Sequence, residues 1–212
     1  MSQSFVSVTD KHARVFFDAP QLSDYYDSVA TLRPLLQNTQ WNDSVTGYYL
    51  FRYQQVPHRE PRPPLLRLTF FVSSEQQADR AFELTNSIPL KIWRTALPVR
   101  EHLLKGKSDA TEYRFRRFLC LATQIGLEVM ETALVDAQQL YRNFQSGPSY
   151  SWGAHRDEFV QFVQQHSLSF RELSKEQKAG FIADTEFNAT WSHNFVGVIV
   201  GDLPQDRKIR RQ

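Results

Sequence analysis

Apolar and polar residues alternate along several short segments of the first hundred residues, which is the pattern of β-strands with two different faces. The third of these segments is the clearest. One of its faces would carry Leu66, Leu68 and Phe70, and the other Leu65, Arg67, Thr69 and Phe71. Together with β-branched and aromatic enrichment, the pattern predicts four strands, at residues 12–19, 47–56, 65–73 and 88–99.

Helical spacing of apolar residues separates these strands. Pro20 opens a predicted helix over residues 20–37, because proline suits the first helical turn. Ser74 and Gln77 form a weak capping box, which predicts a helix to about residue 86. The resulting order, strand–helix–strand–strand–helix–strand, is the split βαβ or ferredoxin-like arrangement. It buries one sheet face under two helices and leaves the other to the rest of the chain, a second subunit or a ligand.

The second half of the chain is helical in pattern. The spacing of apolar residues predicts helices over residues 111–130, 133–144, 155–166 and 175–187, with a turn-rich break at 147–153. Residues 194–200 fit either a helix end or a closing strand. We therefore predict an α+β protein with a ferredoxin-like half at residues 1–104 and a helical half at 105–212, packed into one compact unit.

Composition narrows the class of protein only partly. The 16 phenylalanines, 8 tyrosines and 4 tryptophans favour a large core, a ligand groove or an interface. A net charge of +2 is too small to argue for nucleic acid by itself. Cys120 is the only cysteine, which excludes an intramolecular disulfide and suits a reducing compartment. We expect it to be a buried structural thiol.

Targeting signals are not evident either. The first residues lack a basic region followed by an apolar stretch, and no run approaches the ~18 apolar residues of a membrane span. We therefore expect a cytoplasmic protein with no membrane partner.

Two arginines interrupt the apolar strands. Arg52 and Arg67 each lie within a run of large apolar side chains. Burying a charge costs several kcal/mol unless the charge is paired. These arginines are therefore either paired across adjacent strands or directed at a polar site.

A proline-rich segment joins these two strands. Four prolines in residues 56–64 favour extended backbone and hold His58, Arg59 and Arg62 between the strands. This segment is either an exposed loop or a flap that contacts a substrate or partner.

Motifs for cofactors, phosphate loops and metals are not found, so we expect no cofactor and no metal. The acidic pair Glu128 and Glu131 has the spacing of an ordinary solvated helix face. Basic and aromatic residues at positions 113–118 can grip a nucleic-acid strand, but an amphipathic helix with a charged outer stripe explains them as well. The arginines of this group are Arg114, Arg116 and Arg117.

The two arginine-bearing strands also resemble a known family. Phe51-Arg52-Tyr53 and the segment from Pro64 to Phe70 are similar to strands of the C-terminal elimination domain of lantibiotic dehydratases, found also as stand-alone thiopeptide-type biosynthesis proteins. The similarity covers about residues 12–85. In that family these positions help to bind a peptide and to expel glutamate from glutamylated serine or threonine. Leu65 and Thr69 replace a histidine and an arginine of the family pattern, so only Arg52, Tyr53 and Arg67 carry over.

The resemblance implies a tailoring or substrate-binding protein of ribosomal peptide natural-product biosynthesis, acting on a precursor peptide or with a modifying-enzyme partner. Arg52 and Arg67 would hold an anionic group, helped by Arg59 and Arg62. Tyr53 or His58 would move a proton in a lyase-like reaction.

Three alternatives stay open. One is a ferredoxin-like RNA-binding protein or ribonuclease that stacks bases on Tyr48, Phe51 and Tyr53. Another is a non-catalytic interaction module that presents the proline-rich flap. The last is an α/β-barrel enzyme that is a homodimer closed by sheet-to-sheet packing.

Overall fold

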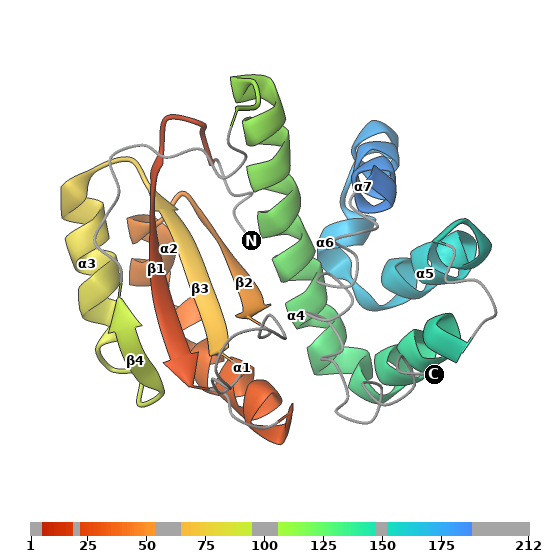
Figure 1. Cartoon of the computed structure of the whole chain (residues 1–212), viewed down its shortest axis with the longest axis horizontal. Helices are drawn as coiled ribbons and strands as arrows, with labels where there is room; N and C mark the ends of the chain where they lie inside the picture. Colours follow the sequence, from red (N-terminus) through yellow and green to blue (C-terminus); the bar gives the residue numbers. More distant parts are fainter. Residues whose placement is uncertain (1–5, 19–21, 54–64, 95–105, 147–151, 188–212) are drawn as a thin grey trace. The chain divides into compact units, whose positions relative to one another are not determined.

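The chain is an α+β protein, seen in a computed structural model that describes residues 6–18, 22–53, 65–94, 106–146 and 152–187 (Figure 1). The described chain separates into two compact units, divided inside a long helix between Cys120 and Leu121. This division lies C-terminal to the boundary that we predicted at residues 104/105. The elements of the first unit are β1 (Lys11–Asp18), α1 (Leu22–Leu36), α2 (Thr39–Ser44), β2 (Gly47–Tyr53), β3 (Leu65–Val72), α3 (Glu75–Thr85), β4 (Lys91–Arg94) and the start of α4 (Asp109–Ser146).

The four strands form one antiparallel sheet in the order β2-β3-β1-β4. β1 therefore lies between β3 and β4, which α3 connects, and β3 lies between β1 and β2. The predicted pairing of the second and third strands is confirmed: Gly47 is opposite Phe71, and Tyr53 is opposite Leu65. β3 ends one residue before the predicted segment and β4 begins three residues after its predicted start, whereas residues 19, 54–56 and 95–99 of the predicted segments lie outside the described residues.

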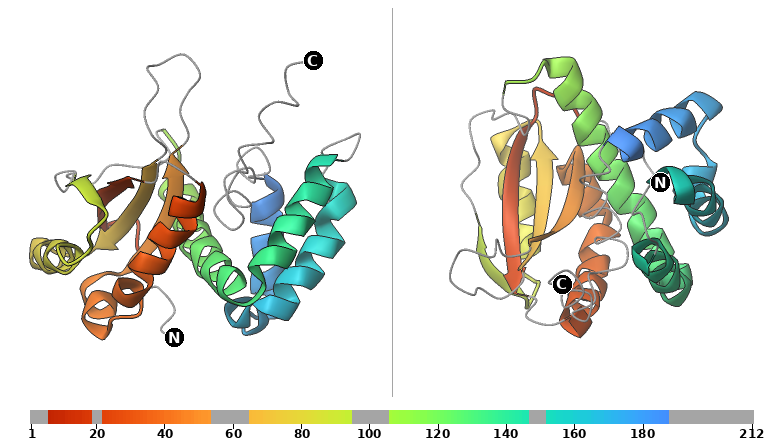
Figure 2. Two further views of the ribbon diagram at one scale, coloured as in Figure 1. Left: turned by 90° about the horizontal axis from the view of Figure 1, so that it is seen from below. Right: turned by 45° about the vertical axis from the view of Figure 1, so that its right-hand side comes forward.

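One face of the sheet is the apolar core of this unit. Leu66, Leu68 and Phe70 share this face, as the alternation predicted, and they are fully buried on it. The Trp41 ring of α2 meets the Phe70 ring edge-on at 5.4 Å, and Phe82 of α3 does so at the same distance. Helices α1, α2 and α3 all lie on this side of the sheet (Figures 1 and 2). α3 begins at the predicted cap, where the Ser74 hydroxyl accepts from the backbone N–H of Gln77.

The opposite face is covered in part by residues 112–120 of α4. Here Val6, Tyr49, Phe71 and Cys120 form a buried cluster, with Leu119 packed against it. Cys120 is therefore a buried thiol, as predicted. The chain itself covers this end of the face that the sequence left without a partner.

The second unit is helical, and its helices largely follow the predicted segments. α5 (Trp152–His166), α6 (Leu168–Arg171) and α7 (Lys175–Phe187) follow the C-terminal part of α4. The predicted break before residue 133 is a kink in α4, where Ala133 has φ −151° and ψ 36°. The short helices α2 and α6 were not predicted. Residues 194–200 lie outside the described part of the chain.

Glu128 fastens α4 to the turn between α5 and α6. Its carboxylate accepts hydrogen bonds from the Ser167 hydroxyl at 2.6 Å, from the Ser169 backbone N–H at 3.0 Å and from the Ser169 hydroxyl. Ser167 also caps α6 by accepting from the Phe170 N–H. Glu128 is thus engaged as a structural acceptor, while its neighbour Glu131 is exposed.

Candidate functional site

Polar side chains gather on the second face of the sheet. The register places Arg14 of β1 opposite Thr69 of β3, and Thr69 opposite Tyr49 of β2. Alternation along each strand puts His12 and Arg67 on the same face. We call these five residues, His12, Arg14, Tyr49, Arg67 and Thr69, the polar face. The Arg67 guanidinium lies over the Tyr49 ring, 5.9 Å from its centroid, in a cation–π contact.

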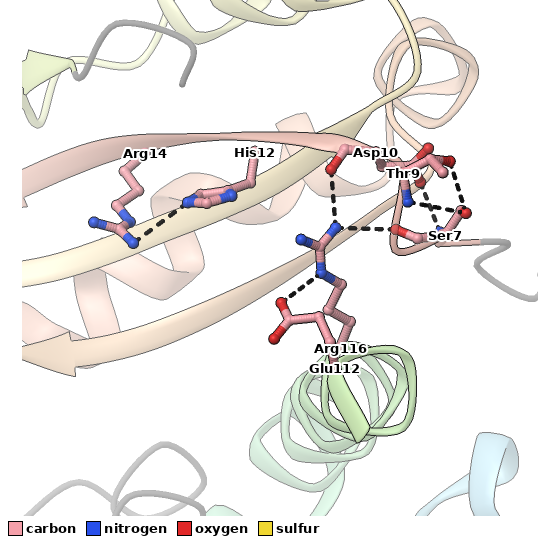
Figure 3. A network of polar contacts seen from close by, with 7 residues as sticks. All are labelled: Ser7, Thr9, Asp10, His12, Arg14, Glu112 and Arg116. Atoms are coloured by element: carbon pink, nitrogen blue, oxygen red, sulfur yellow. Dashed lines mark hydrogen bonds and ion pairs between the residues drawn. The ribbon is translucent and has the colours of Figure 1, made fainter. Parts of the chain in front are cut away.

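A buried ion pair closes one end of the polar face (Figure 3). Arg116 Nε donates to Glu112 Oε1 at 2.9 Å, and both side chains have 0 % exposure. Arg116 Nη1 donates to the backbone carbonyls of Ser7 and Asp10, each at 2.9 Å. The guanidinium also lies 4.9 Å from the centroid of the Phe71 ring. This pair ties α4 to the segment that leads into β1.

Asp10 holds the same segment from its other side. Its carboxylate accepts from the Ser7 backbone N–H at 2.7 Å and from the Thr46 hydroxyl at 2.6 Å. Because Thr46 directly precedes β2, the entries to β1 and β2 are linked through one buried carboxylate. Asp10 and Arg116 together therefore fix the end of β1 from which His12 projects.

The charges around the polar face affect the protonation state of His12. This residue is 1 % exposed, and its pKa is lowered from 6.5 to about 4, with burial as the largest cause. The positive charges of Arg14, Arg116 and Arg67 contribute to this lowered pKa, and the negative charge of Glu112 opposes them. His12 is therefore neutral at pH 7, in surroundings where positive charge outweighs negative.

The structure separates the two arginines that were predicted to act together. Arg52 is opposite Leu66, so its position belongs to the row of the apolar face, whereas Arg67 belongs to the polar face. Tyr53 is opposite Leu65, which places its position in the row of Arg67. His58, Arg59 and Arg62 lie outside the described residues.

Two predictions on which the RNA-binding alternative depended are wrong. Arg116 is buried in an ion pair and is not part of a solvated basic stripe, although Arg114 and Arg117 are exposed. Tyr48 lies on the apolar face, where its ring meets Trp41 at 6.2 Å, so it cannot share a stacking platform with Phe51 and Tyr53. Burial there raises the pKa of Tyr48 to about 12.

His12 and Arg14 were missed by the sequence analysis, which used only the apolar residues of this strand. The signal was present, because polar residues at positions 12 and 14 alternate with Ala13 and Val15. That alternation marks a strand with one apolar and one polar face.

Groups of three or more metal-ligating side chains are not found in the described part of the chain. Among the helices that the structure describes, none is long and apolar enough to cross a bilayer. The sequence matches no protein-family model, and neither the curated proteins nor the solved structures include a significant match to it.

Proposed function

We propose that this chain is a tailoring or substrate-binding protein of ribosomal peptide natural-product biosynthesis, and that its polar face holds a carboxylate of the precursor peptide. The observation that carries the proposal is that a neutral, buried His12 shares one sheet face with two arginines, Arg14 beside it and Arg67 diagonal to Arg14. An electropositive face with one uncharged imidazole suits an anion better than a cation.

The positions of the two arginines support a carboxylate as the anion. Arg14 is opposite Thr69 and Arg67 is opposite Phe16, so the two arginines are diagonal neighbours on adjacent strands. Diagonal neighbours on one sheet face are about 7–8 Å apart, within reach of long side chains. A guanidinium pairs with a carboxylate through two parallel hydrogen bonds, which gives orientation as well as affinity.

The resemblance supports a peptide as the carrier of that carboxylate. Arg67 and Tyr53, two of the three positions that carry over, belong to the same row of the sheet. In a lyase reaction Tyr53 would take the Cα proton of a glutamylated serine or threonine as the Cβ–O bond breaks, and Arg67 would hold the glutamate carboxylate that leaves. The third position, Arg52, belongs to the opposite row and takes no part in this site.

The proposal includes the fold of the first unit, which we assign to the ferredoxin-like group. Both crossover connections place a third strand between the strands that they join, as a split βαβ unit requires. With this function we also propose a cytoplasmic location, which a single, buried cysteine supports.

A pair of matched peptides tests the proposed function. Acetyl-Ala-Glu-Ala-amide should bind the full-length protein in an NMR titration more tightly than acetyl-Ala-Gln-Ala-amide, which lacks the carboxylate. Arg67→Met should weaken glutamyl-peptide binding about 10- to 100-fold, because a charge-assisted hydrogen bond contributes ~1.5–3 kcal/mol. Arg80→Met, which removes an exposed arginine from α3, is the control and should bind as the wild type does.

Two results would contradict the proposal. One is equal binding of the two peptides by the wild-type protein, and the other is unchanged glutamyl-peptide affinity in Arg67→Met.

RNA binding is the second candidate function, and the surface that could perform it lies on α4. There Arg117 lies over the exposed ring of Tyr113, 5.5 Å from its centroid, which is a pair that can stack on a base. Binding of oligouridine that falls steeply with salt would favour this candidate. An interaction module built on the proline-rich segment stays a prediction, because that segment lies outside the described residues.

A further inference from the structure

We propose that His12 and Thr69 are binding residues that donate hydrogen bonds to one oxygen of the carboxylate on the polar face, while arginine holds the other oxygen. This inference rests on the proposed function and deepens it, because it makes the site selective for an acceptor with two oxygens. Its support is the hydrogen bonding of two buried side chains, His12 and Thr69.

The tautomer of His12 follows from its neighbour. Arg14 Nη2 lies 3.4 Å from His12 Nε2 (Figure 3). Arginine has only donors, so Nε2 must be the acceptor in this contact. A neutral imidazole carries its single proton on the other nitrogen, and the proton of His12 is therefore on Nδ1.

The His12 Nδ1–H and the Thr69 hydroxyl are both buried hydrogen-bond donors. Neither His12 Nδ1 nor Thr69 Oγ1 has a hydrogen-bond partner among the described residues, and the two side chains are 1 % and 0 % exposed. Buried polar groups in native proteins are nearly always satisfied by protein, water or ligand. An acceptor is therefore expected beside them.

The register makes these two residues neighbours. His12 is opposite Phe71 and Thr69 is opposite Arg14, so their Cα atoms are diagonal neighbours on the polar face, about 7–8 Å apart. In the proposed complex one ligand oxygen lies between the two side chains and accepts from both. Trp41 Nε1 is another buried donor without a partner in the described residues, but its ring packs against Phe70 on the apolar face. It does not belong to this site.

The geometry explains why neutral donors are useful next to arginines. A carboxylate has two oxygens and about four lone-pair directions, and one guanidinium cannot saturate all of them. Uncharged donors from β1 and β3 add directional contacts without adding like charge beside Arg14 and Arg67. The amide of glutamine would present its NH₂ group to one set of donors, so the site would reject it.

Thr69→Val tests the inference, because valine keeps the shape of the side chain and removes only the hydroxyl. Glutamyl-peptide binding should weaken about 5- to 10-fold, and the preference over the glutaminyl peptide should shrink. Thr69→Ser keeps the hydroxyl and should stay within about twofold of the wild type. Thr85→Val is the control, because the Thr85 hydroxyl is also buried but donates to the Phe82 carbonyl in α3.

A second readout uses the wild-type protein and depends on no variant. In ¹⁵N-labelled protein, long-range ¹H–¹⁵N correlations should show His12 protonated at Nδ1, and this nitrogen should shift when the glutamyl peptide binds. An Nε2–H tautomer, an Nδ1 that does not respond to the peptide, or a Thr69→Val variant with unchanged affinity would overturn the inference.

The outcomes separate this inference from the proposed function. If Arg67→Met loses binding while Thr69→Val does not, the carboxylate site stands and the buried donors are satisfied by water alone. If the wild-type protein binds neither peptide, the inference falls together with the proposed function.

Discussion

Removing the Arg116 side chain should strongly destabilise the first unit. Arg116→Met keeps a long side chain with good helix propensity, but it removes the guanidinium that lies 2.9 Å from the Glu112 carboxylate. It also removes the donors to the carbonyls of Ser7 and Asp10. Both charged side chains are fully buried, so the variant leaves a buried carboxylate without this cation. Breaking a buried pair in this way typically costs ~3–5 kcal/mol.

A double variant separates the charge from the packing. Glu112→Gln combined with Arg116→Met has no buried carboxylate, so it should be more stable than Arg116→Met alone by ~1–2 kcal/mol, although it carries one more substitution. Arg117→Met is the control on the same helix. Its side chain is exposed, and its loss should change stability by less than ~1 kcal/mol.

The assay should report on the first unit by itself, because a chain with two compact units need not unfold in one step. Hydrogen exchange of the β1 amides, followed by NMR in increasing urea, meets this requirement. The reasoning is refuted if Arg116→Met costs less than ~1 kcal/mol, or if the double variant is less stable than the single one.

Two further predictions concern other parts of the molecule. The folded-state pKa of His12 is lowered, so the unfolded chain takes up the proton first, and stability should fall as pH drops from about 6.5 to about 4. The neutral His12 contributes up to ~3 kcal/mol to the free energy of unfolding. Urea melts of His12→Gln should lack that part of the pH dependence. Identical pH profiles of the variant and the wild-type protein would contradict the lowered pKa. In the second unit, Glu128→Ala should cost ~2 kcal/mol because three donors of Ser167 and Ser169 lose their acceptor. Thermal melts measure both variants: Glu131→Ala, which removes an exposed carboxylate, should cost clearly less, and equal costs would refute the role of Glu128.

Local patterns predicted much of the fold. Alternation along β3 assigned Leu66, Leu68 and Phe70 to one face, and the structure buries all three on the apolar face. Periodicity gave the limits of α7 (Lys175–Phe187) and the break in α4 at Ala133. These features depend only on the order of residues within one element, so the sequence alone is sufficient to predict them.

Several features that depend on contacts between elements were not predicted. Arg52 and Arg67 were expected to share a site, but the pairing of β2 with β3 puts their positions in opposite rows, and a shift of one residue in that pairing would have reversed the assignment. Arg116 was read as a surface charge because the sequence does not show that α4 meets Phe71 and the carbonyls before β1. His12 and Arg14 were missed for a different reason: their alternation with Ala13 and Val15 lies within one strand, but only the apolar residues of that strand were considered.

The most direct test of the carboxylate site is a map of where the glutamyl peptide binds. Backbone ¹H–¹⁵N spectra of the full-length wild-type protein should be recorded during titration with acetyl-Ala-Glu-Ala-amide and, separately, with its glutaminyl counterpart. We predict that the largest shift changes fall on alternate positions of β1 and β3, at His12, Arg14, Arg67 and Thr69, and that the glutaminyl peptide produces much smaller changes. Changes centred on Tyr113 and Arg117, changes confined to the second unit, or equal responses to the two peptides would contradict the account.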